Sequence, residues 1–493
     1  MSTKDTATLP RVLGPVTALC VIVGSVIGSG IFIVPARVAH EVPSIGGIAT
    51  VWVVGGLFTL AGALTLAELG AMLPRAGGPY VYLREAYGPL FGFLFGWTEF
   101  LVIRAGSVAT LAAAFALYFA QLAPAPAWLG GELWRMAAAV AAIATVAVVN
   151  VIGTRVGGAL QVAGTTLKVG ALGVMIVLPF LLGQADSARL TPVRPGSLNL
   201  GMLQGMMVAM VAVLWAYDGW VNSTALAEEV RNPERNMPLS LILGALILIA
   251  IYVTMTMVYH MVLTLPEIQS AATEKGSSKV VAAEFCGTLL GPAGITAISL
   301  VVMGSTFISL NGNAMSGPRA YFAMARDGLF PQRLCEIHPR FQTPANAVIA
   351  QSAWASLLTV TATALIVAPA PGASSGLPAP LLAAWTKLNQ TPLYDVLYEY
   401  VIFGGTLFYM LTVLSVFVLR VKRPNYVRPY RTWGYPVTPA LYIMASLLLM
   451  GNMLVHAPFG SLAGLLLIAL GLPVYWLYIH KKPVAEDAVE PGR

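Results

Sequence analysis

The chain has 493 residues, of which 57% are hydrophobic and 10% charged, and its formal net charge is +7. Soluble domains carry about 25% charged residues, so this composition excludes a water-soluble globular protein. Apolar runs of membrane-spanning length recur along nearly the whole sequence, and no polar stretch is long enough to form a separate domain. The sequence therefore predicts one all-α polytopic membrane domain over residues 1–493.

Twelve apolar segments are long enough to cross a bilayer, which takes about 20 helical residues. They cover residues 12–36, 46–72, 89–120, 133–152, 158–182, 202–230, 239–263, 293–321, 345–370, 395–419, 437–456 and 460–479. The first, sixth and eighth segments exceed a straight crossing, which indicates a tilt, a break or a cytoplasmic extension.

Lys and Arg residues are distributed unevenly between the loops. With the amino terminus inside, the cytoplasmic segments hold 19 of the 28, the opposite side holds seven, and Arg104 and Lys168 lie within helices. Because cytoplasmic loops retain positive charge, both termini are expected in the cytoplasm, with the protein in the inner membrane. This topology explains the net charge without a nucleic-acid partner, and it leaves open a membrane-surface role for the basic cluster at 420–431.

The short polar amino terminus, Met1 to Pro10, is not followed by a cleavage site, so no cleaved signal is expected. Cys20, Cys286 and Cys335 fall in a helix, an outer loop and an inner loop. Their separation predicts no structural disulfide, and none has a metal-ligand neighbour. Neither a metal nor a cofactor is expected.

The first span contains a stretch in which a helix can unwind, GSVIGSGIFIVP. Three glycines lie within seven residues, and Pro35 follows them. Close helix packing through small residues is the alternative, but that motif needs small residues four apart on one face. Because Gly28, Ser29 and Gly30 are consecutive, the sequence favours a break in mid-membrane.

The sixth span carries Asp218 and Gly219 in the middle of an apolar run, among Trp215, Tyr217 and Trp220. A carboxylate at this depth costs about 2.5–3.5 kcal/mol on insertion scales, and it marks either a transport pathway or an ion pair between helices. The adjacent glycine and aromatic residues favour a second break.

Spans one and six begin two halves of five helices each, residues 12–182 and 202–419, and two additional helices follow in residues 437–479. Interrupted helices at matching positions of two repeats indicate the substrate site of a transporter. Amides freed at the start of a half-helix attract an anion, and carbonyls freed at the end of one attract a cation. A zwitterionic amino acid therefore suits both breaks.

Several motifs along the chain resemble those of the amino acid-polyamine-organocation (APC) superfamily. They are GSVIGSGIF in span one, LPRAGGPYVYLREAYG at 73–88, NPERNMP at 232–238, SGPRAYFAMARDGLFP at 316–331 and RPYRTWGYP at 428–436. WTEFLVIRAGS at 97–107 is similar to the L-type amino acid transporter family and its bacterial members, whose third helix carries an arginine at the place of Arg104. The resemblance implies a LeuT-like fold of 5+5 inverted repeats, with broken helices 1 and 6 and 12 transmembrane helices.

The resemblance also assigns substrate positions residue by residue. The positions around the substrate backbone are Val26, Gly28, Ser29, Gly30, Trp215 and Asp218. Ser29 and Gly30 would hold the carboxylate, while the carbonyls of Val26 and Trp215 would hold the α-amino group. The Trp215 side chain would close over the occupied site as its gate. Most family members with mammalian partners carry glycine at the place of Asp218, so whether this carboxylate faces the ammonium or another group stays open.

Side-chain selectivity is expected from spans three, eight and ten. The residues are Val102, Ile103, Ser107, Ser309, Asn313 and Gly405. For Val102 and Ile103, ordinary helix packing is an equal alternative. Apart from Asp218 the lining is uncharged, which favours neutral amino acids.

Lys168 lies deep in span five. At 1.5 Å per residue from Gly158 it is roughly 15 Å into a core about 30 Å thick, so its ammonium needs buried acceptors. The expected acceptors are carbonyls freed at the first break and hydroxyls of span eight, such as those of Ser305 or Thr306. The resemblance implies that this ammonium takes the place of Na⁺, and we expect it to act as a coupling switch whose proton is exchanged during transport. A permanent structural cation is the alternative.

Four other charged residues allow two interpretations each. Glu99 and Arg104, five residues apart in span three, form either an internal ion pair or a coupling or gating element. Glu228 and Glu229 end span six either in solvent or as part of an electrostatic gate. The candidate partners in that gate are Arg75, Arg84 and Arg231.

Two loops and the partners complete the predictions. The loop 264–292 resembles the outer re-entrant hairpin of the family, while the Pro/Gly/Ser-rich stretch 368–380 has no assigned function. The loop from Gln121 to Glu132 lacks the cysteine through which some relatives join a glycoprotein heavy chain. We expect a monomer without a disulfide-linked heavy chain, whose partners are an amino acid substrate and the lipid bilayer.

Three functions compete. A membrane enzyme needs a nucleophile, metal cluster or acid–base pair, which five scattered His residues do not supply. A channel needs a water-lined polar path, which the sparse intramembrane charge argues against. The sequence favours a secondary transporter that works by alternating access, as a Na⁺-independent exchanger of neutral L-amino acids. A proton-coupled symporter of amino acids or polyamines is the alternative within that class.

Overall fold

The computed structural model describes residues 9–191, 199–273, 281–368, 393–456 and 458–479. These residues form helices and connecting segments without a β-strand, which confirms the predicted all-α class. The first half contains α1 (Pro15–Val26), α2 (Gly30–Glu41), α3 (Ile45–Met72), α4 (Pro79–Tyr87), α5 (Pro89–Thr98), η1 (Glu99–Ile103), α6 (Arg104–Leu122), α7 (Gly131–Ile152), α8 (Thr154–Leu181) and η2 (Ser187–Leu190). The rest contains α9 (Leu200–Tyr217), α10 (Asn222–Ala225), η3 (Ala227–Glu229), α11 (Pro233–Val262), α12 (Leu265–Thr273), α13 (Val281–Leu290), α14 (Pro292–Arg326), η4 (Gln332–Cys335), α15 (Ala345–Val367), α17 (Leu393–Lys422), α18 (Val437–His456), α19 (Pro458–Ala469), α20 (Gly471–Val474) and η5 (Tyr475–Ile479).

Eleven helices of this part of the chain are long and apolar enough to cross a membrane, and the bent pair of α1 and α2 is a twelfth candidate. Most helix ends fall within a few residues of the predicted spans, and α18 coincides with the span at 437–456. The largest difference is at α11, which begins at Pro233 rather than near residue 239. Helix α14 continues past residue 321 to Arg326, with Pro318 inside it. Helix α8 begins at Thr154 rather than near Gly158.

Span one is broken where the sequence predicts it. Helix α1 ends at Val26, α2 begins at Gly30, and the two helices are bent by 41° relative to each other. Ile27 leaves the helical region with φ −70° and ψ 84°. Pro35 lies inside α2 and not at the break.

Span six is broken at the predicted carboxylate. Helix α9 ends at Tyr217, Asp218 is extended, and Gly219 has φ +109°, a region that favours glycine. A short helical segment, α10, resumes at Asn222. Two interrupted helices therefore exist in this bundle, as expected.

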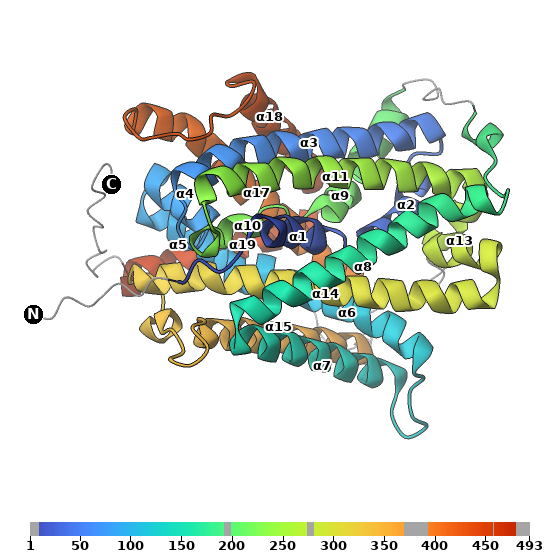
Figure 1. The fold of residues 1–493 in the computed structure, drawn as a ribbon, viewed down its shortest axis with the longest axis horizontal. Helices are drawn as coiled ribbons and strands as arrows, with labels where there is room; N and C mark the ends of the chain where they lie inside the picture. The colour runs from blue at the N-terminus through green and yellow to red at the C-terminus, as the bar shows by residue number, and fades with distance from the viewer. Residues whose placement is uncertain (1–8, 192–198, 274–280, 369–392, 457, 480–493) are drawn as a thin grey trace, which may run out of the picture.

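The two broken helices lie inside the bundle. Helix α1 packs against α11, α8 and α14, and it lies near the middle of the molecule in Figure 1. Long helices surround it: α3 runs beside α11, and α14 runs beside α6. Helices α7 and α15 pack together on one flank, while α18 lies on the opposite flank (Figure 1).

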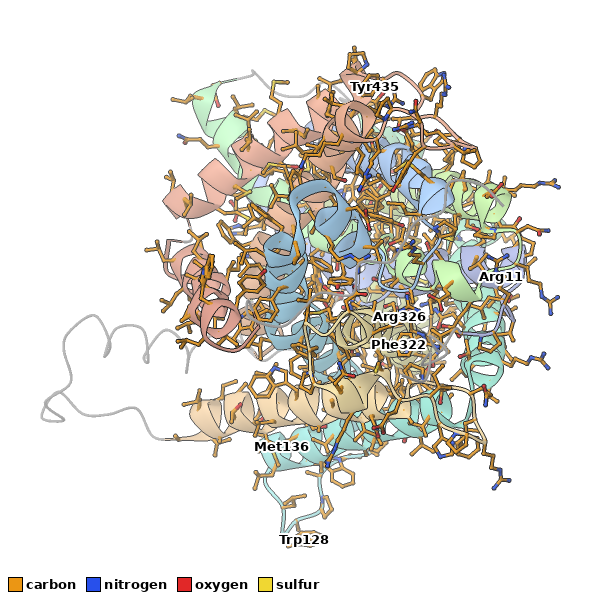
Figure 2. All side chains as sticks on the ribbon, turned by 90° about the vertical axis from the view of Figure 1, so that its left-hand side faces the viewer. Arg11, Trp128, Met136, Phe322, Arg326 and Tyr435 are labelled. Carbon is orange, nitrogen blue, oxygen red and sulfur yellow. The ribbon has the colours of Figure 1, made fainter. Side chains whose placement is uncertain are left out.

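Segments predicted to be cytoplasmic meet at one end of the bundle. The carboxylate of Glu228 accepts hydrogen bonds from the amides of Leu9 at 2.9 Å and Ala76 at 3.0 Å. The ammonium of Lys422 donates to the carbonyl of Ala86 at 2.9 Å. Figure 2 views the molecule from this end.

The predicted outer loop 264–292 contains α12 and α13, which both pack against α2; α13 also packs against α14. The Gln269 side chain donates to the carbonyl of Ala39 at 2.9 Å, which ties α12 to the end of α2. The stretch 368–380 lies, from residue 369 onward, outside the described residues.

Candidate functional site

A small cavity lies between the two breaks. It has an empty volume of about 330 Å³. Its walls are formed by Ser25, Val26, Gly28, Ser29, Gly30, Ser107, Leu111, Trp215, Asp218, Gly219 and Asn313. Eight of the twelve residues proposed from the sequence around the substrate therefore lie around one space. The residues that do not line it are Val102, Ile103, Ser309 and Gly405.

Gly405 lies in a second cavity that shares Asp218 with the first. Its other lining residues are Phe58, Thr59, Ile103, Leu214, Trp220, Ile402, Thr406, Tyr409 and Tyr442. The sequence pointed to Ile103 and Gly405 and named Trp220 as a neighbour of the second break, but it did not point to Phe58, Tyr409 or Tyr442. Val102 is buried and lines neither of these two cavities. Asp218 thus lies at the junction of a small polar space and a larger aromatic one.

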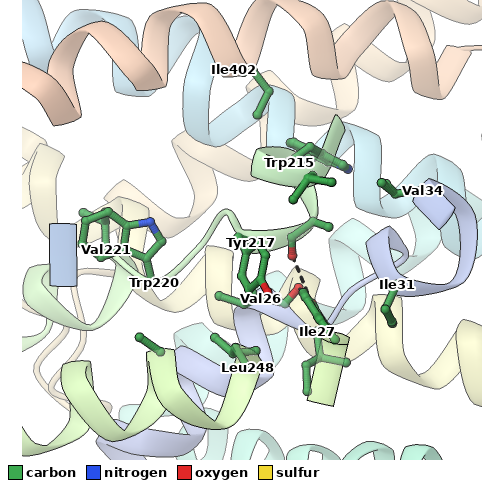
Figure 3. Close-up of a cluster of buried hydrophobic side chains, with 14 of the residues drawn as sticks. Val26, Ile27, Ile31, Val34, Trp215, Tyr217, Trp220, Val221, Leu248 and Ile402 are labelled. Carbon is green, nitrogen blue, oxygen red and sulfur yellow. Dashed lines mark hydrogen bonds between the residues drawn. The ribbon is translucent and has the colours of Figure 1, made fainter. Parts of the chain in front are cut away.

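Figure 3 draws the buried hydrophobic side chains around the two breaks. Val26 and Ile27, at the end of α1, lie close to Trp215 and Tyr217, at the end of α9. Trp215 is almost fully buried. Both helices therefore direct their last turns toward the same region.

The Lys168 side chain binds the unwound segment of span one. Its ammonium donates to the carbonyls of Gly24 at 2.6 Å, Ile27 at 2.5 Å and Ser305 at 3.2 Å, and to the hydroxyl of Ser309 at 3.1 Å. The predicted carbonyls of the break are thus its partners. A hydroxyl of span eight is also a partner, as predicted, but it belongs to Ser309, while Ser305 contributes its backbone carbonyl.

Two serines of α14 reinforce the same break. The hydroxyl of Ser305 lies 2.9 Å from the Ile27 carbonyl and 3.2 Å from the Gly28 carbonyl. The hydroxyl of Ser309 lies 2.9 Å from the carbonyls of Gly24 and Ile27. Ser309 was expected to face the substrate side chain, but its hydroxyl bonds to the backbone of span one.

Tyr252 of α11 connects the two breaks, and the sequence reasoning missed it. Its hydroxyl lies 3.0 Å from the Val26 carbonyl in span one and 3.0 Å from the Ala216 carbonyl in span six. The Val26 carbonyl also accepts from the amide of Gly28 at 2.7 Å. Because a carbonyl oxygen has two lone pairs, a substrate ammonium would compete with Tyr252 for Val26.

Gly30 is the point of closest approach between the broken helices. A Cβ atom there would lie 2.7 Å from Cα and 2.8 Å from Cβ of Ala216. At Gly28 the nearest atoms would be side-chain atoms, Leu111 Cδ2 at 3.2 Å and Ser309 Oγ at 3.4 Å. The two glycines therefore differ: Gly30 meets the other broken helix, whereas Gly28 meets side chains that can adjust.

Arg104 directly follows a π-helical turn, η1, in span three. Its guanidinium donates to Glu99 at 2.6 and 2.9 Å, which confirms the internal ion pair. It also donates to the side-chain oxygens of Asn222 at 2.5 Å and Asn313 at 2.6 Å. A π-helical turn often marks a functional site, and here it brings the carboxylate of Glu99 to the guanidinium.

Glu228 and Glu229 have partners that the sequence reasoning did not propose. Glu229 is fully buried and accepts from Nε of Arg319 at 2.7 Å. Glu228 pairs with Arg326 at 3.2 Å. The prediction of a solvated helix end or of pairing with Arg75, Arg84 or Arg231 was wrong, because α14 extends far enough to bring two arginines of its own beneath span six.

Further polar contacts join the helices near Glu228 and Glu229. Arg84 pairs with Asp327, and the hydroxyl of Tyr80 donates to that carboxylate. Arg319 also donates to the hydroxyl of Thr154, at the start of α8, at 2.9 Å. These bonds join α4, α8, η3 and α14 between the cavity and the predicted cytoplasmic end.

Among the described residues, no group of three or more His, Cys, Asp and Glu side chains is arranged to hold a metal ion. No disulfide joins Cys20, Cys286 and Cys335, all of which lie among the described residues. The polar atoms that surround the first cavity are backbone groups, hydroxyls, amides and one carboxylate. Such groups can bind a small polar molecule without covalent chemistry.

An all-helical bundle whose two interrupted helices enclose one cavity is the architecture of a secondary transporter. The chain matches the family model "Amino acid permease" over residues 13–477. It is 32% identical to the serine/threonine exchanger SteT of Bacillus subtilis, over 97% of this chain and 98% of that protein. It is also 32% identical to the human b(0,+)-type amino acid transporter 1, over 97% and 90%, and 28% identical to the human cystine/glutamate transporter, over 97% and 88%.

The chain therefore belongs to the amino acid permease family of the APC superfamily. It is an amino acid transporter with a LeuT-like fold, as the motifs in spans one, three and eight predict.

Proposed function

We propose that this protein exchanges neutral L-amino acids across the inner membrane by alternating access, without Na⁺. The observation that carries the proposal is the cavity bounded by both breaks, with Ser29 and Gly30 on one side and Trp215 and Asp218 on the other. The relatives that are themselves exchangers or amino acid transporters by name support the mode and the substrate class.

The breaks suit the two charges of a zwitterion. The first amides of α2 have no partner within their own helix, and the helix dipole adds positive potential there. A carboxylate would bind at Ser29 and Gly30, beside Gly28. The carboxyl ends of α1 and α9 supply carbonyls and negative potential, so an α-ammonium would bind near Val26 and Trp215. In this proposal Trp215 is the gate over the occupied site.

The charges of the residues that line the two cavities favour a substrate with a neutral side chain. Asp218 is the one carboxylate among the residues that line the two cavities. It interacts electrostatically with the buried guanidinium of Arg104. Ser107, Asn313 and Gly405 add uncharged surface around the remaining space, which suits small or medium neutral side chains.

Lys168 supports Na⁺ independence. Its ammonium holds three carbonyls and a hydroxyl at 2.5 to 3.2 Å, a set of oxygen ligands that a small cation would otherwise bind. While it is protonated, this ammonium makes an added Na⁺ unfavourable at the same point.

The partners and the location are part of the proposal. Both termini lie in the cytoplasm, and the end with the Arg319–Glu229 and Arg326–Glu228 pairs is the inner end. The protein works as a monomer. It has no disulfide-linked heavy chain, because the segment from Gln121 to Glu132 contains no cysteine. It performs no covalent chemistry on its substrate and is not an enzyme.

Counterflow in proteoliposomes tests the proposal. Vesicles loaded with one unlabelled amino acid should take up labelled neutral amino acids with saturation and stereoselectivity, equally with and without Na⁺. Uptake that needs no internal substrate and rises with an imposed pH gradient would favour proton-coupled symport of amino acids or polyamines, for which Lys168 is the candidate coupling residue. Flux without saturation would indicate a channel, and a chemically altered substrate an enzyme.

A further inference from the structure

The segment that runs from the last turn of α17 through the loop to α18 is rich in basic residues. Residues 420–436 read RVKRPNYVRPYRTWGYP, with five arginine and lysine residues and no carboxylate. Transporters concentrate positive charge on cytoplasmic loops during insertion, so the charge alone needs no partner. The contacts of each cation show whether its charge is already used within the protein or is available to a partner.

Two of the five cations, Arg420 and Arg428, contact a buried carboxylate and so stabilise the conformation of the loop. Glu68, at the end of α3, accepts from Arg420 at 2.7 and 3.0 Å and from the amide of Thr432 at 2.7 Å, and it lies 3.5 Å from Arg428. Arg428 also donates to the carbonyl of Arg423 at 2.9 Å. One buried carboxylate therefore holds both ends of the loop in a fixed conformation.

The other three cations are Lys422, Arg423 and Arg431. Within the described part of the chain, none of them has a carboxylate within ion-pair distance, and all three are exposed. Lys422 donates to the carbonyl of Ala86, which directs its ammonium without neutralising it. Counting only the described residues, this preformed surface thus carries three positive charges that no carboxylate compensates.

Trp433 lies next to these charges, and 76% of its surface is exposed. Val427 and Val437 nearby are also exposed. Tryptophan concentrates at the headgroup level of membranes. In the end view, Tyr435 of this loop lies at the rim of the molecule, whereas Arg326 lies nearer its centre (Figure 2). The rim is where a surrounding bilayer meets the protein.

We propose that Lys422, Arg423, Arg431 and Trp433 form a binding surface for the headgroups of anionic phospholipids in the adjoining leaflet. The cations would contact the phosphate and the anionic headgroup, and the indole would lie at the level of the glycerol backbone. The proposal is independent of which amino acid is carried.

The surface is well placed to influence transport. Helix α17 supplies Ile402, Gly405, Thr406 and Tyr409 to the second cavity, and α18 supplies Tyr442. A lipid bound where these helices join would hold the outer wall of that cavity against the core. We therefore expect transport to be faster in membranes that contain anionic lipid.

Photo-crosslinking of the full-length protein in vesicles tests the binding. A photoactivatable phosphatidylglycerol and a photoactivatable phosphatidylcholine are compared, and labelled peptides are mapped by mass spectrometry. The phosphatidylglycerol probe should label the peptide that covers 420–436 preferentially. Arg423→Gln and Arg431→Gln should each lower that labelling about fivefold, the effect of one basic residue at a membrane surface.

Matched controls are Arg333→Gln and Arg340→Gln, which remove exposed arginines near η4, outside the loop. These variants should keep the labelling of 420–436 unchanged. Counterflow in phosphatidylcholine vesicles with and without phosphatidylglycerol provides the second measurement, and Arg423→Gln/Arg431→Gln should lose the stimulation. Equal labelling by both probes, or labelling that survives the double substitution, would overturn the proposal and leave the charges a determinant of topology only.

Discussion

The ammonium of Lys168 lies 2.5 Å from the carbonyl oxygen of Ile27, at the point where span one stops being helical. Lys168 is near the middle of α8, about 21 Å from the start of that helix. A cation at this depth stays only where fixed dipoles replace water. The backbone freed by the break and the lysine on α8 therefore stabilise each other.

Lys168→Ala should slow translocation at least tenfold and change substrate affinity much less. Removing the ammonium leaves buried carbonyls without a charged hydrogen bond, each worth about 1.5–3 kcal/mol, and about 1.4 kcal/mol is a tenfold change in rate. The measurement is the initial counterflow rate beside equilibrium binding of labelled substrate. Thr166→Ala, on the exposed side of the same helix, is the control. A variant with the wild-type rate and pH profile would show that Lys168 is neither a switch nor a structural cation.

Gly30→Ala should abolish transport while Gly28→Ala retains a measurable rate. The added methyl group at Gly30 meets the backbone of Ala216 at 2.7 Å, so the two broken helices must separate. At Gly28 it meets the end of the flexible Leu111 side chain at 3.2 Å. Counterflow rates of both variants, normalised to the amount of monodisperse protein, provide the comparison. Equal rates in the two would show that contact between the breaks does not control transport.

Local chemistry predicted much of this fold and site. Gly28–Ser29–Gly30 and Asp218–Gly219 interrupt their helices through backbone freedom and burial cost, which act within a few residues and can be read from a sequence. Gly30 was placed at the break in this way, and at the substrate carboxylate through the family resemblance. Its contact with Ala216 could not be predicted, because the distance between two segments depends on the packing of the whole bundle.

Long-range partners could not be predicted in the same way. Glu229 lies close in sequence to Arg231, yet it pairs with Arg319, since α14 continues through Pro318 and brings its last turns under span six. The hydroxyl of Tyr252 reaches two carbonyls from the middle of an apolar helix. Nothing in the sequence around Tyr252 distinguishes it from a tyrosine that only packs.

Tyr252→Phe should lower the transport rate about tenfold, because the variant keeps the ring but removes the hydroxyl between Val26 and Ala216. One neutral hydrogen bond contributes about 0.5–1.5 kcal/mol, and an acceptor left unsatisfied costs about 1–3 kcal/mol. Tyr87→Phe is the control, since the Tyr87 hydroxyl donates to the carbonyl of Leu411 at 3.0 Å, away from both breaks. Rates and apparent affinities are measured by counterflow. Similar rates in the two variants would exclude a special role for Tyr252.

Glu229→Gln should destabilise the protein strongly, by about 3–5 kcal/mol, because it leaves the buried guanidinium of Arg319 without its counter-charge. Glu132→Gln removes an exposed pair with Arg135 and should cost less than about 1 kcal/mol. Thermal unfolding of both variants in detergent measures the difference. A Glu229→Gln variant as stable as the wild type would mean that the end of the bundle beneath span six is closed by packing and not by this pair.

Asp218→Asn tests the substrate class, because Asp218 lies on the walls of both cavities. If the protein carries neutral amino acids, this carboxylate serves the charge balance with Arg104, and the amide keeps its size and its oxygen. The variant should then transport neutral amino acids with an apparent affinity within about fivefold of the wild type, a change near 1 kcal/mol. If the carried molecule is a cationic amino acid or a polyamine, the carboxylate is its counter-charge, and the variant should lose that transport while Ser107→Ala keeps it. Counterflow with a neutral and a cationic amino acid, run on Asp218→Asn and Ser107→Ala side by side, separates the two cases. Selective loss of cation transport would refute the neutral assignment and leave the exchange mechanism standing.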